Sequence, residues 1–600
     1  MKINIQNIIM PEKDFFHDCT ELFFAGTCCR IESESAWAIP KYSLFSLVKY
    51  FNDFSMKKWK RFTTLQSVDI ELMLRGKGMV SIYGIDKGIE MPVRNKIGEF
   101  EYSCDSKEQV NFHVPDNNFC MIGMEISTYT DTYFYGGQFI GTFPDTEIKN
   151  IELSIATTTC RKEQFIKNNI AIIYNELLNT DKDISKHLKV HIVDNGRTLK
   201  PSDFPEDDRI ILHENKNVGG SGGYARGMIE SINQAPQATH VLLMDDDVVV
   251  LPEAIFRTYV ILRTLRKEYS SSFISGAMFG IENKKSQHED VGYVKESGYY
   301  HPFKMSYDQS ILNSNLDCEE RCTDGDLTYA AWWYCCIPIR VISENGFPMP
   351  FFVRGDDVEY SLRCNANLIT MNGICVWHMG FANKFNVPMN HYQEIRNMFV
   401  AKAITPSLQS VTQYRKMVLS FRKHILRFDY DSAELVIRAL EDYLKGPQFL
   451  QIDQGEKILK ENNKLTHDYF PISEFGLNIN DIENLYMDSS RGFIKKWFYR
   501  FTWNGQKLWL GSSHKRAIVP FDDTHMPGRT AFCTEIICVN PFTETGFKLE
   551  RNKEKFRETI KHYRNVIKLY KKTHEKIDED YREQKTYITS LEFWKKYLEM

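Results

Sequence analysis

Between residues 151 and 250, short apolar runs alternate with longer segments in which apolar residues recur every three or four positions. The runs at 151–160 and 189–196 have the length and the β-branched content of strands. The segments at 161–179 and 222–234 have helical spacing. Strands that alternate with helices predict a parallel, doubly wound sheet, in which ligands bind where the strands end.

The flanking parts of the chain have different patterns. Residues 1–150 contain short aromatic and β-branched runs broken by Gly, Asn and Asp, which is typical of an antiparallel β-sandwich. Its aromatic residues, among them Trp37 and Trp59, would either stack on sugar rings or form an ordinary core. Residues 396–600 have mainly helical spacing. We therefore predict an α/β protein with a carbohydrate-binding-like sandwich at 1–150, a Rossmann-like nucleotide domain at 151–395 and a helical region at 396–600.

One apolar run in the central part stops at three consecutive aspartates. The run Val241–Met244 resembles a buried strand, and Asp245, Asp246 and Asp247 follow it directly. Alternation along a strand places Asp245 and Asp247 on one side and Asp246 on the other. Hard oxygen ligands at the carboxyl end of a strand suit Mg²⁺ or Mn²⁺ holding a diphosphate. A solvated acidic turn is the alternative, but the buried-type strand leading into the triplet favours the metal site.

A glycine-rich segment precedes this strand. The thirteen residues Asn215–Gly227 include five glycines, with two Gly-Gly pairs before a predicted helix. Glycines let the backbone approach a ligand, and a helix N-terminus attracts phosphate. The segment matches neither the P-loop pattern nor the dinucleotide-binding pattern. A flexible turn is the alternative, although the position between two site-forming strands favours ligand binding.

Three features beyond residue 330 suit a sugar site. Trp332 and Trp333 would either line an acceptor cleft with their flat faces or lie in the core. Asp356 and Asp357 open a predicted helix, and because both cannot cap it, one is available as a general base. His378 ends a short apolar run and would be either a nitrogen ligand for the metal or a structural residue.

Composition narrows the functional classes. A net charge of −4 gives no general attraction for nucleic acid. Fourteen cysteines, two pairs of them adjacent, are typical of reduced thiols in a cytoplasmic protein. No signal-peptide core or membrane-spanning apolar run is present. Residues 494–516 interleave Trp and Phe with Lys and Arg, a pattern shared by peripheral contacts with the inner face of the cell membrane and by packed helices with snorkelling basic residues.

The order of these motifs resembles a known family. T-T-x-x-R, V-D-N-G, N-x-G-G-x-G-G, D-D-D, W-W, D-D-x-E-x-x-L-R and W-H occur in that order over roughly residues 135 to 400. The chain is thereby similar to the inverting family 2 glycosyltransferases of GT-A fold, and most closely to the polymerising galactofuranosyltransferases of mycobacterial cell-wall galactan. The resemblance implies a central GT-A nucleotide-sugar domain between the sandwich and the helical region.

The resemblance also implies roles for individual residues. Asp357 would be the catalytic base, with Asp356 beside it. The metal Mn²⁺ or Mg²⁺ would be held by Asp245, Asp247 and His378; the nucleotide sugar by Arg161, Asp194, Asn195, Asn217, Gly219, Gly220, Gly222, Gly223 and Asp246; and the acceptor by Trp332, Trp333 and Glu359. Arg354-Gly355 before the acidic pair departs from the mycobacterial pattern, which leaves the acceptor and the linkage open.

The function implied is metal-dependent, inverting transfer of galactofuranose from UDP-galactofuranose to a growing, lipid-linked cell-surface glycan, by a cytoplasmic enzyme. The oligomeric state, monomer or homo-oligomer, stays open. Three alternatives stay open at the level of sequence. The donor would be another nucleotide sugar in capsule or O-antigen synthesis, the protein would bind carbohydrate without catalysis, or it would be a metal-dependent nucleotidyltransferase. Without a glycine-rich lysine loop for a triphosphate, the last is least favoured.

Overall fold

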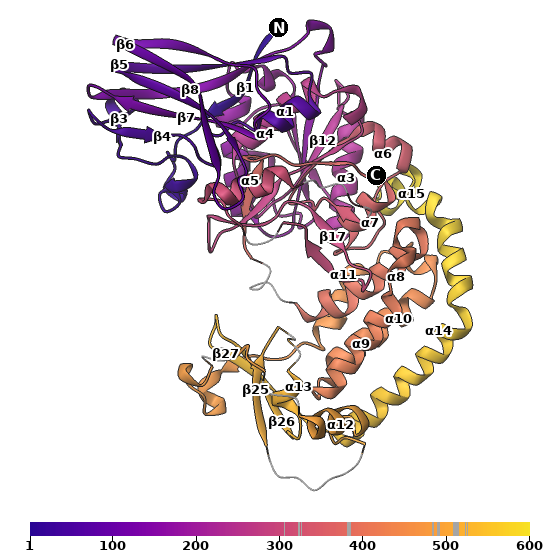
Figure 1. The fold of residues 1–600 in the computed structure, drawn as a ribbon. Coiled ribbons are helices and arrows are strands. Elements are labelled where there is room, and N and C mark those ends of the chain that lie inside the picture. The colour runs from indigo at the N-terminus through magenta and orange to yellow at the C-terminus, as the bar shows by residue number, and fades with distance from the viewer. Residues whose placement is uncertain are drawn as a thin grey trace.

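The computed structural model has three parts arranged around a concave side (Figure 1). It describes residues 1–600 except 305–306, 322–324, 326, 381–385, 483–484, 489–491, 508–514, 523 and 525. A β-rich N-terminal part packs on a central α/β part, and a helical C-terminal region extends from it to a small sheet. One hydrophobic cluster runs through all three parts.

The N-terminal part is an antiparallel sheet of eight strands. Its longest strand, β5 (Ser67–Asp86), alternates buried and partly exposed residues over most of its length, as a sheet with one covered face requires. Along one edge β5 pairs with β6 (Val93–Val114), and along the other it pairs first with β8 (Thr132–Thr142) and then with β7 (Met121–Thr128). The β-rich N-terminal part of the predicted fold is confirmed, and its strands form one hydrogen-bonded sheet.

The two tryptophans considered for sugar stacking in this part differ in exposure. Trp59, on α1 (Met56–Phe62), has no exposed surface and stacks on Phe54 with ring centroids 5.7 Å apart. Trp59 is therefore a core residue, because its ring faces cannot reach a ligand. Trp37, on β3 (Ala36–Ile39), stays partly exposed.

The central sheet is the α/β core that the strand and helix pattern predicts. Its seven strands follow the order β11 (Ile210–Glu214), β10 (Leu188–Asp194), β9 (Leu153–Thr159), β12 (His240–Asp245), β21 (Tyr334–Pro338), β14 (Phe273–Ser275) and β22 (Leu368–Ile369). The first four run parallel, so that Thr159, Asp194 and Asp245 end at the same edge. The strand β11 was not predicted. It ends four residues before Gly219, where α3 (Gly219–Asn233) begins.

A second, five-stranded sheet carries the other half of the site. In it β13 (Val249–Val250) pairs antiparallel with β23 (Cys375–His378), and β23 runs parallel to β15 (Ala277–Gly280). Val249 pairs with Trp377, which brings the segment after the acidic triplet beside the end of β23. β16 (Ser286–Glu289) lies on the far side of β15.

The C-terminal region combines predicted helices with a sheet that was not predicted. The helices α8 (Glu394–Ile404), α9 (Gln413–Leu426) and α10 (Tyr430–Leu444) pack together. A four-stranded sheet follows, formed by β24 (Phe470–Pro471), β27 (Thr545–Glu550), β26 (Glu535–Asn540) and β25 (Arg516–Pro520). The sheet adds to the mainly helical region that was expected, and its strand β26 is a short buried run flanked by turns.

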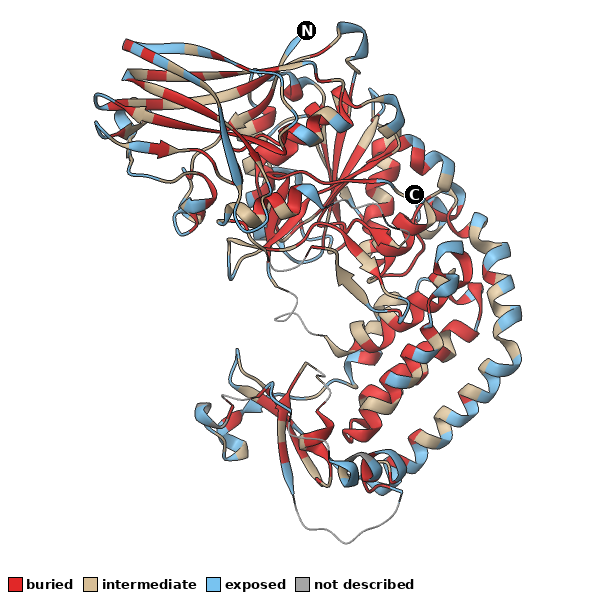
Figure 2. Ribbon diagram, in the orientation of Figure 1, coloured by how far each residue is buried: buried red, intermediate tan, exposed pale blue. Residues whose placement is uncertain are grey.

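Two C-terminal helices return the chain to the central part. α14 (Lys553–Ile588) is a long helix that runs along the outer side of the molecule, and most of its residues are exposed or partly exposed (Figure 2). α15 (Leu591–Leu598) then packs against α3, with the Trp594 ring close to Gly222. Among the described helices, none combines the length and the apolar character that crossing a bilayer requires.

Candidate active site

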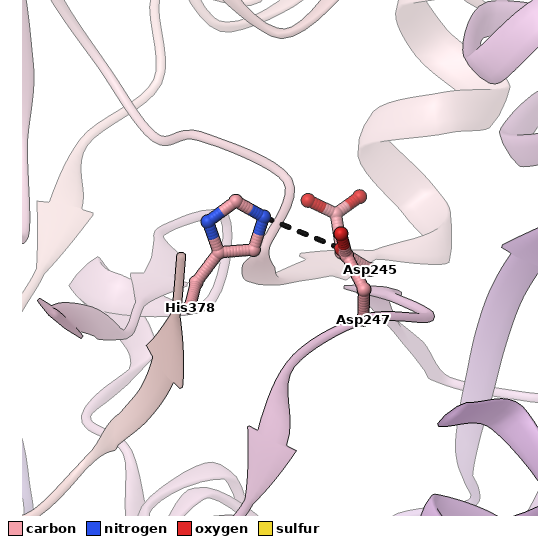
Figure 3. Close-up of side chains that lie close together, drawn as sticks. All are labelled: Asp245, Asp247 and His378. Atoms are coloured by element: carbon pink, nitrogen blue, oxygen red, sulfur yellow. Dashed lines mark ion pairs between the residues drawn. The ribbon is translucent and has the colours of Figure 1, made fainter. Parts of the chain in front are cut away.

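Two aspartates of the triplet and one histidine converge where β12 and β23 end (Figure 3). Asp245, Asp247 and His378 each offer a ligand atom, and these atoms lie within 4.8 Å of one another. Nε2 of His378 is 3.3 Å from Oδ1 of Asp247. Nδ1 of His378 donates a hydrogen bond to the carbonyl of Met379 at 2.7 Å, which leaves Nε2 facing the carboxylates. Two carboxylates and one imidazole form a donor set suited to Mn²⁺ or Mg²⁺.

The middle aspartate, Asp246, is not among these three ligands. Asp246 is buried, and burial raises the pKa of its carboxyl to about 6, opposed by the nearby Lys162. Nζ of Lys162 lies 3.3 Å from Oδ1 of Asp246 and 2.8 Å from Oδ2 of Asp247. Asp245 and Asp247 therefore lie together, as the alternation predicts, and Lys162 bridges Asp246 and Asp247. Lys162 was not predicted, since a lysine at the start of a helix carries no signal by itself.

The glycine-rich segment packs tightly rather than forming a flexible turn. Gly219 begins α3 at a φ of +74°, and a Cβ there would lie 2.0 Å from the carbonyl oxygen of Phe352. A Cβ at Gly223 would lie 1.9 Å from Oγ1 of Thr158, and one at Gly222 would lie 2.1 Å from its neighbour Val218. These glycines let the N-terminus of α3 approach β9 and the segment before α7 (Asp356–Arg363).

Gly220 differs from the other three glycines. A Cβ at Gly220 would have no neighbour closer than Oδ2 of Asp356, at 3.9 Å. Oγ of Ser221 donates a hydrogen bond to the same Oδ2 at 2.8 Å. The N-terminus of α3, the positive end of the helix dipole, is therefore directed at Asp356.

The second acidic pair opens α7. Asp356 is buried, and burial raises the pKa of its carboxyl while the Ser221 hydrogen bond opposes the rise. Asp357 is half-buried, and its Oδ1 accepts a hydrogen bond from the amide of Val358 at 2.8 Å. Burial, and then repulsion by Asp356, raise the pKa of the Asp357 carboxyl to about 7. A carboxylate with a pKa near neutrality is suited to accept a proton at physiological pH.

Two residues that the sequence did not single out join these clusters. Burial, followed by repulsion from Asp357, raises the pKa of Glu289 on β16 to about 8, so this carboxyl lies within electrostatic reach of Asp357. The hydroxyl of Tyr224 on α3 donates to Oδ1 of Asp245 at 2.6 Å and to the carbonyl of Trp332 at 3.3 Å. Neither position has a motif around it, and only the folding of the chain brings them to the site.

Most of the residues predicted to contact the nucleotide form hydrogen bonds within the loops that follow the strands. Asp194 is fully buried, and its carboxylate accepts hydrogen bonds from the amides of Gly196, Thr198 and Leu199 at 2.7 to 2.9 Å. The predicted direct contact of Asp194 with a nucleotide does not fit this placement, because both oxygens are used within the loop. Arg161 is exposed just beyond β9, with a φ of +59°.

Two asparagines tie these loops to the glycine-rich segment. Nδ2 of Asn195 donates to the carbonyl of Gly219 at 3.0 Å, and its Oδ1 accepts from Asn215 at 2.8 Å. Oδ1 of Asn217 accepts from the amide of Gly219 at 3.3 Å. Asn195 and Asn217 therefore hold the backbone that would meet the donor.

The predicted acceptor residues are buried. Trp332 and Trp333 are 4% and 6% exposed, and Nε1 of Trp333 donates to the carbonyl of Gly276 at 3.0 Å. The antiparallel pairing of β21 with β12 places this pair beside the acidic triplet, where it supports the wall of the site. Glu359 has no exposed surface and forms an ion pair with Arg363 at 2.6 Å. A direct acceptor contact by Glu359 does not fit this placement, since its carboxylate is enclosed.

Comparisons with known proteins agree with the motif resemblance. The family described as "Galactofuranosyltransferase 2 N-terminal" matches residues 5–131. The galactofuranosyltransferase GlfT2 of Mycobacterium tuberculosis is 27% identical over 435 residues, which cover 68% of this chain and 66% of the relative. GlfT2 of Mycolicibacterium smegmatis is 26% identical over 68% of this chain and 64% of its own length. The predicted resemblance is confirmed: the chain is similar to GlfT2-like galactofuranosyltransferases, and the match spans slightly less than two thirds of their length.

Solved structures give weaker likenesses. The mannosyltransferase PcManGT from Pyrobaculum calidifontis, in complex with GDP-Man and Mn²⁺, is 11% identical with a TM-score of 0.29, over 49% of this chain and 75% of that chain. GalNAc-T7 with UDP, GalNAc and Mn²⁺ is 10% identical with a TM-score of 0.30, over 44% of this chain and 49% of that chain.

Proposed function

We propose that this chain is an inverting, metal-dependent glycosyltransferase that transfers galactofuranose from UDP-galactofuranose to a lipid-linked glycan. One observation carries the proposal. Helix α3 connects the two acidic clusters: Oγ of Ser221 donates to Asp356, the neighbour of Asp357, at 2.8 Å, and the hydroxyl of Tyr224 donates to Asp245 at 2.6 Å. A proton acceptor and a cluster of hard ligands thereby share one site, as a displacement at an activated sugar requires. The similarity to galactofuranosyltransferases supports the choice of donor.

The chain's own residues supply most of the mechanism. Asp357 accepts the proton of the acceptor hydroxyl, and the oxygen attacks the anomeric carbon from the side opposite the leaving diphosphate. The glycines at the start of α3 would let a diphosphate approach the backbone of the helix closely. Asp245, Asp247 and His378 would hold Mn²⁺ or Mg²⁺, and such an ion would supply positive charge beside the diphosphate of the donor. A single displacement from the opposite face inverts the anomeric centre. It needs no covalent intermediate.

A donor screen tests the proposal. Purified protein with Mn²⁺ is incubated with UDP-galactofuranose, UDP-galactopyranose, UDP-glucose or dTDP-rhamnose and a galactofuranosyl acceptor. We expect UDP release and acceptor extension with UDP-galactofuranose, with loss of both in EDTA. If only another donor releases its nucleotide diphosphate, the sugar assignment is wrong but the protein is still a transferase.

Two further outcomes would remove the transferase proposal itself. Pyrophosphate release would indicate a nucleotidyltransferase. A carbohydrate-binding protein without catalysis would release no nucleotide from any donor, and its glycan affinity would be unchanged in Asp357→Asn. For the transferase, Asp357→Asn should lose turnover by about 10²- to 10⁴-fold while still binding UDP. Asp208→Asn, an exposed carboxylate before β11, is the matched control and should retain activity.

A further inference from the structure

The turn that leads into α7 has an unusual backbone conformation. Phe352 and Arg354 have φ values of +73° and +71°, and Gly355 follows them at +79°. Glycine adopts this left-handed region freely, but a residue with a Cβ is strained there. Two strained residues so close together persist only where the surrounding structure holds them. The turn ends at Gly355, directly before the acidic pair that contains the proposed base, Asp357, so whatever holds the turn also places the base.

One side chain of α8 holds two carbonyl groups of this turn. Nδ2 of Asn397 donates to the carbonyl of Val353 at 2.9 Å and to that of Arg354 at 2.6 Å. These carbonyls belong to the two planar peptide groups that flank Arg354, so holding both fixes the φ and ψ of Arg354. Asn397 is 1% exposed, and water therefore cannot replace these hydrogen bonds. Helix α8 belongs to the C-terminal region and lies beside α7 (Figure 1).

Arg396 determines which way the amide of Asn397 points. Its Nε and Nη2 donate to Oδ1 of Asn397 at 2.9 and 2.7 Å. Because a guanidinium carries only donors, Oδ1 of the amide faces it and Nδ2 faces the carbonyls of the turn. Nη2 of Arg396 also donates to the carbonyl of Phe351 at 2.8 Å. The two neighbouring residues of α8 thus form a clamp with a single orientation.

The first strained residue of the turn is held from another side. The amide of Ser221 on α3 donates to the carbonyl of Phe352 at 3.2 Å. Neither of the two hydrogen bonds from Asn397 goes to this carbonyl. Helix α3 therefore holds the turn at Phe352, and Asn397 holds it at Arg354, the strained residue nearer to the base.

We propose that Asn397 is a positioning residue for the transfer reaction: by holding the peptide groups on both sides of Arg354, it keeps the turn left-handed and places Asp357 for the acceptor hydroxyl. The inference rests on the proposed function, because Asn397 acts through the base. Without the clamp, the turn should relax, since residues with a Cβ prefer negative φ. Asp357 would then leave its position, and a displacement of about 1 Å is enough to slow a reaction greatly.

Kinetics of Asn397→Leu test the proposal, because this substitution removes both donors without adding a charge. We expect kcat to fall by about 10- to 100-fold while UDP affinity changes by less than about twofold, since α3 still holds Phe352. The acidic limb of kcat/KM should shift to lower pH, because burial raises the pKa of Asp357 to about 7 and a relaxed turn exposes this carboxyl. An unchanged kcat or an unmoved limb would overturn the proposal.

Asn52→Leu is the matched control. Nδ2 of Asn52 also donates to two backbone carbonyls, those of Ile9 at 2.9 Å and Phe23 at 2.7 Å, and Asn52 has no exposed surface. Because Asn52 lies in the N-terminal part, its variant should lose stability in thermal melting but keep the wild-type kcat and pH profile. Equal losses of kcat in the two variants would show that general destabilisation explains the effect, and the proposal would fail.

A glycine at position 354 should rescue the Asn397 variant. Arg354→Gly and Arg354→Ala both remove the arginine side chain, but only alanine keeps the strain at a φ of +71°. Added to Asn397→Leu, Arg354→Gly should give a kcat about fivefold or more above that with Arg354→Ala. Equal values would contradict a clamp on a strained turn. The same comparison decides the matter if Asn397→Leu folds only with glycine at position 354.

Hydrogen–deuterium exchange separates this inference from the proposed function. In Asn397→Leu, the peptide that covers residues 350–358 should exchange faster than in the wild type, whereas in Asn52→Leu its exchange should be unchanged. An active wild type whose exchange in this peptide is not altered by Asn397→Leu overturns only the role of Asn397. A wild type that transfers no sugar overturns the proposed function, and with it the role of Asn397 in catalysis.

Discussion

The ammonium nitrogen of Lys162 lies 2.8 Å from Oδ2 of Asp247, so a cation of the protein already occupies one side of the acidic cluster. Replacing Lys162 with Met removes a positive charge that competes with a metal for this carboxylate. We expect Lys162→Met to bind Mn²⁺ on the order of tenfold more tightly in the absence of nucleotide. The same variant should bind UDP more weakly in the presence of Mn²⁺, because a cation near the diphosphate is lost. Isothermal titration calorimetry measures both affinities.

The control for this variant is Lys167→Met, five residues further along the same helix. Lys167 pairs with Asp203 at 2.8 Å and is not in contact with the acidic triplet. Both Mn²⁺ and UDP affinities should be unchanged in Lys167→Met. Weaker Mn²⁺ binding by Lys162→Met would contradict the prediction and indicate that the lysine organises the cluster.

Transfer activity should depend on the protonation of Asp357. Burial and the Asp356 charge raise the pKa of its carboxyl to about 7, and only the ionised form accepts a proton. As pH falls below about 7, the ionised fraction falls, so kcat/KM should decrease by about tenfold for each pH unit. As pH rises above 7, activity should level off. A profile that stays flat down to pH 5 would exclude Asp357 as the base.

Removing the Ser221 hydroxyl should move this pH profile. The hydrogen bond from Ser221 lowers the pKa of Asp356, so Ser221→Ala should raise that pKa. A larger neutral fraction of Asp356 repels Asp357 less, and the pKa of Asp357 should then fall. The acidic limb of kcat/KM should therefore shift to lower pH. In Ser343→Ala, which loses only a hydrogen bond to the carbonyl of Ile339 on α6 (Ile339–Asn345), the limb should not move.

Two glycines of the same helix should respond in opposite ways to alanine. Gly223→Ala places a Cβ 1.9 Å from Oγ1 of Thr158, so β9 and α3 must separate. We expect a loss of about 1 to 3 kcal/mol in the free energy of unfolding and weaker UDP binding. Gly220→Ala meets no atom closer than 3.9 Å and should leave stability unchanged or raise it, because alanine favours a helix. Thermal melting and UDP titration compare the two; equal effects would contradict the packing argument.

Replacing Glu359 should lower the free energy of unfolding and leave the binding of the acceptor unchanged. Its ion pair with Arg363 is buried, and Arg363 also donates to the carbonyl of Phe347 at 2.8 Å. Glu359→Gln should cost about 3 to 5 kcal/mol, because the buried guanidinium loses its partner charge. Breaking the exposed pair of Arg340 and Glu344 by Glu344→Gln should cost less than about 1 kcal/mol.

The measurement is denaturant unfolding of each variant, followed by kinetics at a temperature where the variant is folded. A structural role predicts an acceptor KM close to that of the wild type. An increased acceptor KM with unchanged stability would restore the acceptor role of Glu359. Glu359→Leu combined with Arg363→Met should recover part of the loss, since no buried charge stays unpaired.

The local sequence pattern was sufficient to predict the elements of the central sheet, where apolar runs form strands and polar residues follow them. The run Val241–Met244 forms the buried strand that its length and apolar content predicted, and Asp245 and Asp247 after it lie together. Parallel strands end at one edge, so the polar residues after β9, β10 and β12 had to be neighbours. The four-stranded sheet and β11 were missed because short strands within a helical or polar context resemble turns.

The sequence by itself determined which chemistry the chain can perform, because residue types at strand ends and a glycine-rich helix start limit the ligands that fit. Only the tertiary structure decided which of those side chains are available. Tyr224 reached the acidic cluster through the packing of α3, whereas the carboxylates of Asp194 and Glu359 are engaged by internal hydrogen bonds and an ion pair. Burial and the pairing of polar groups depend on contacts between distant segments, and a linear pattern does not contain those contacts.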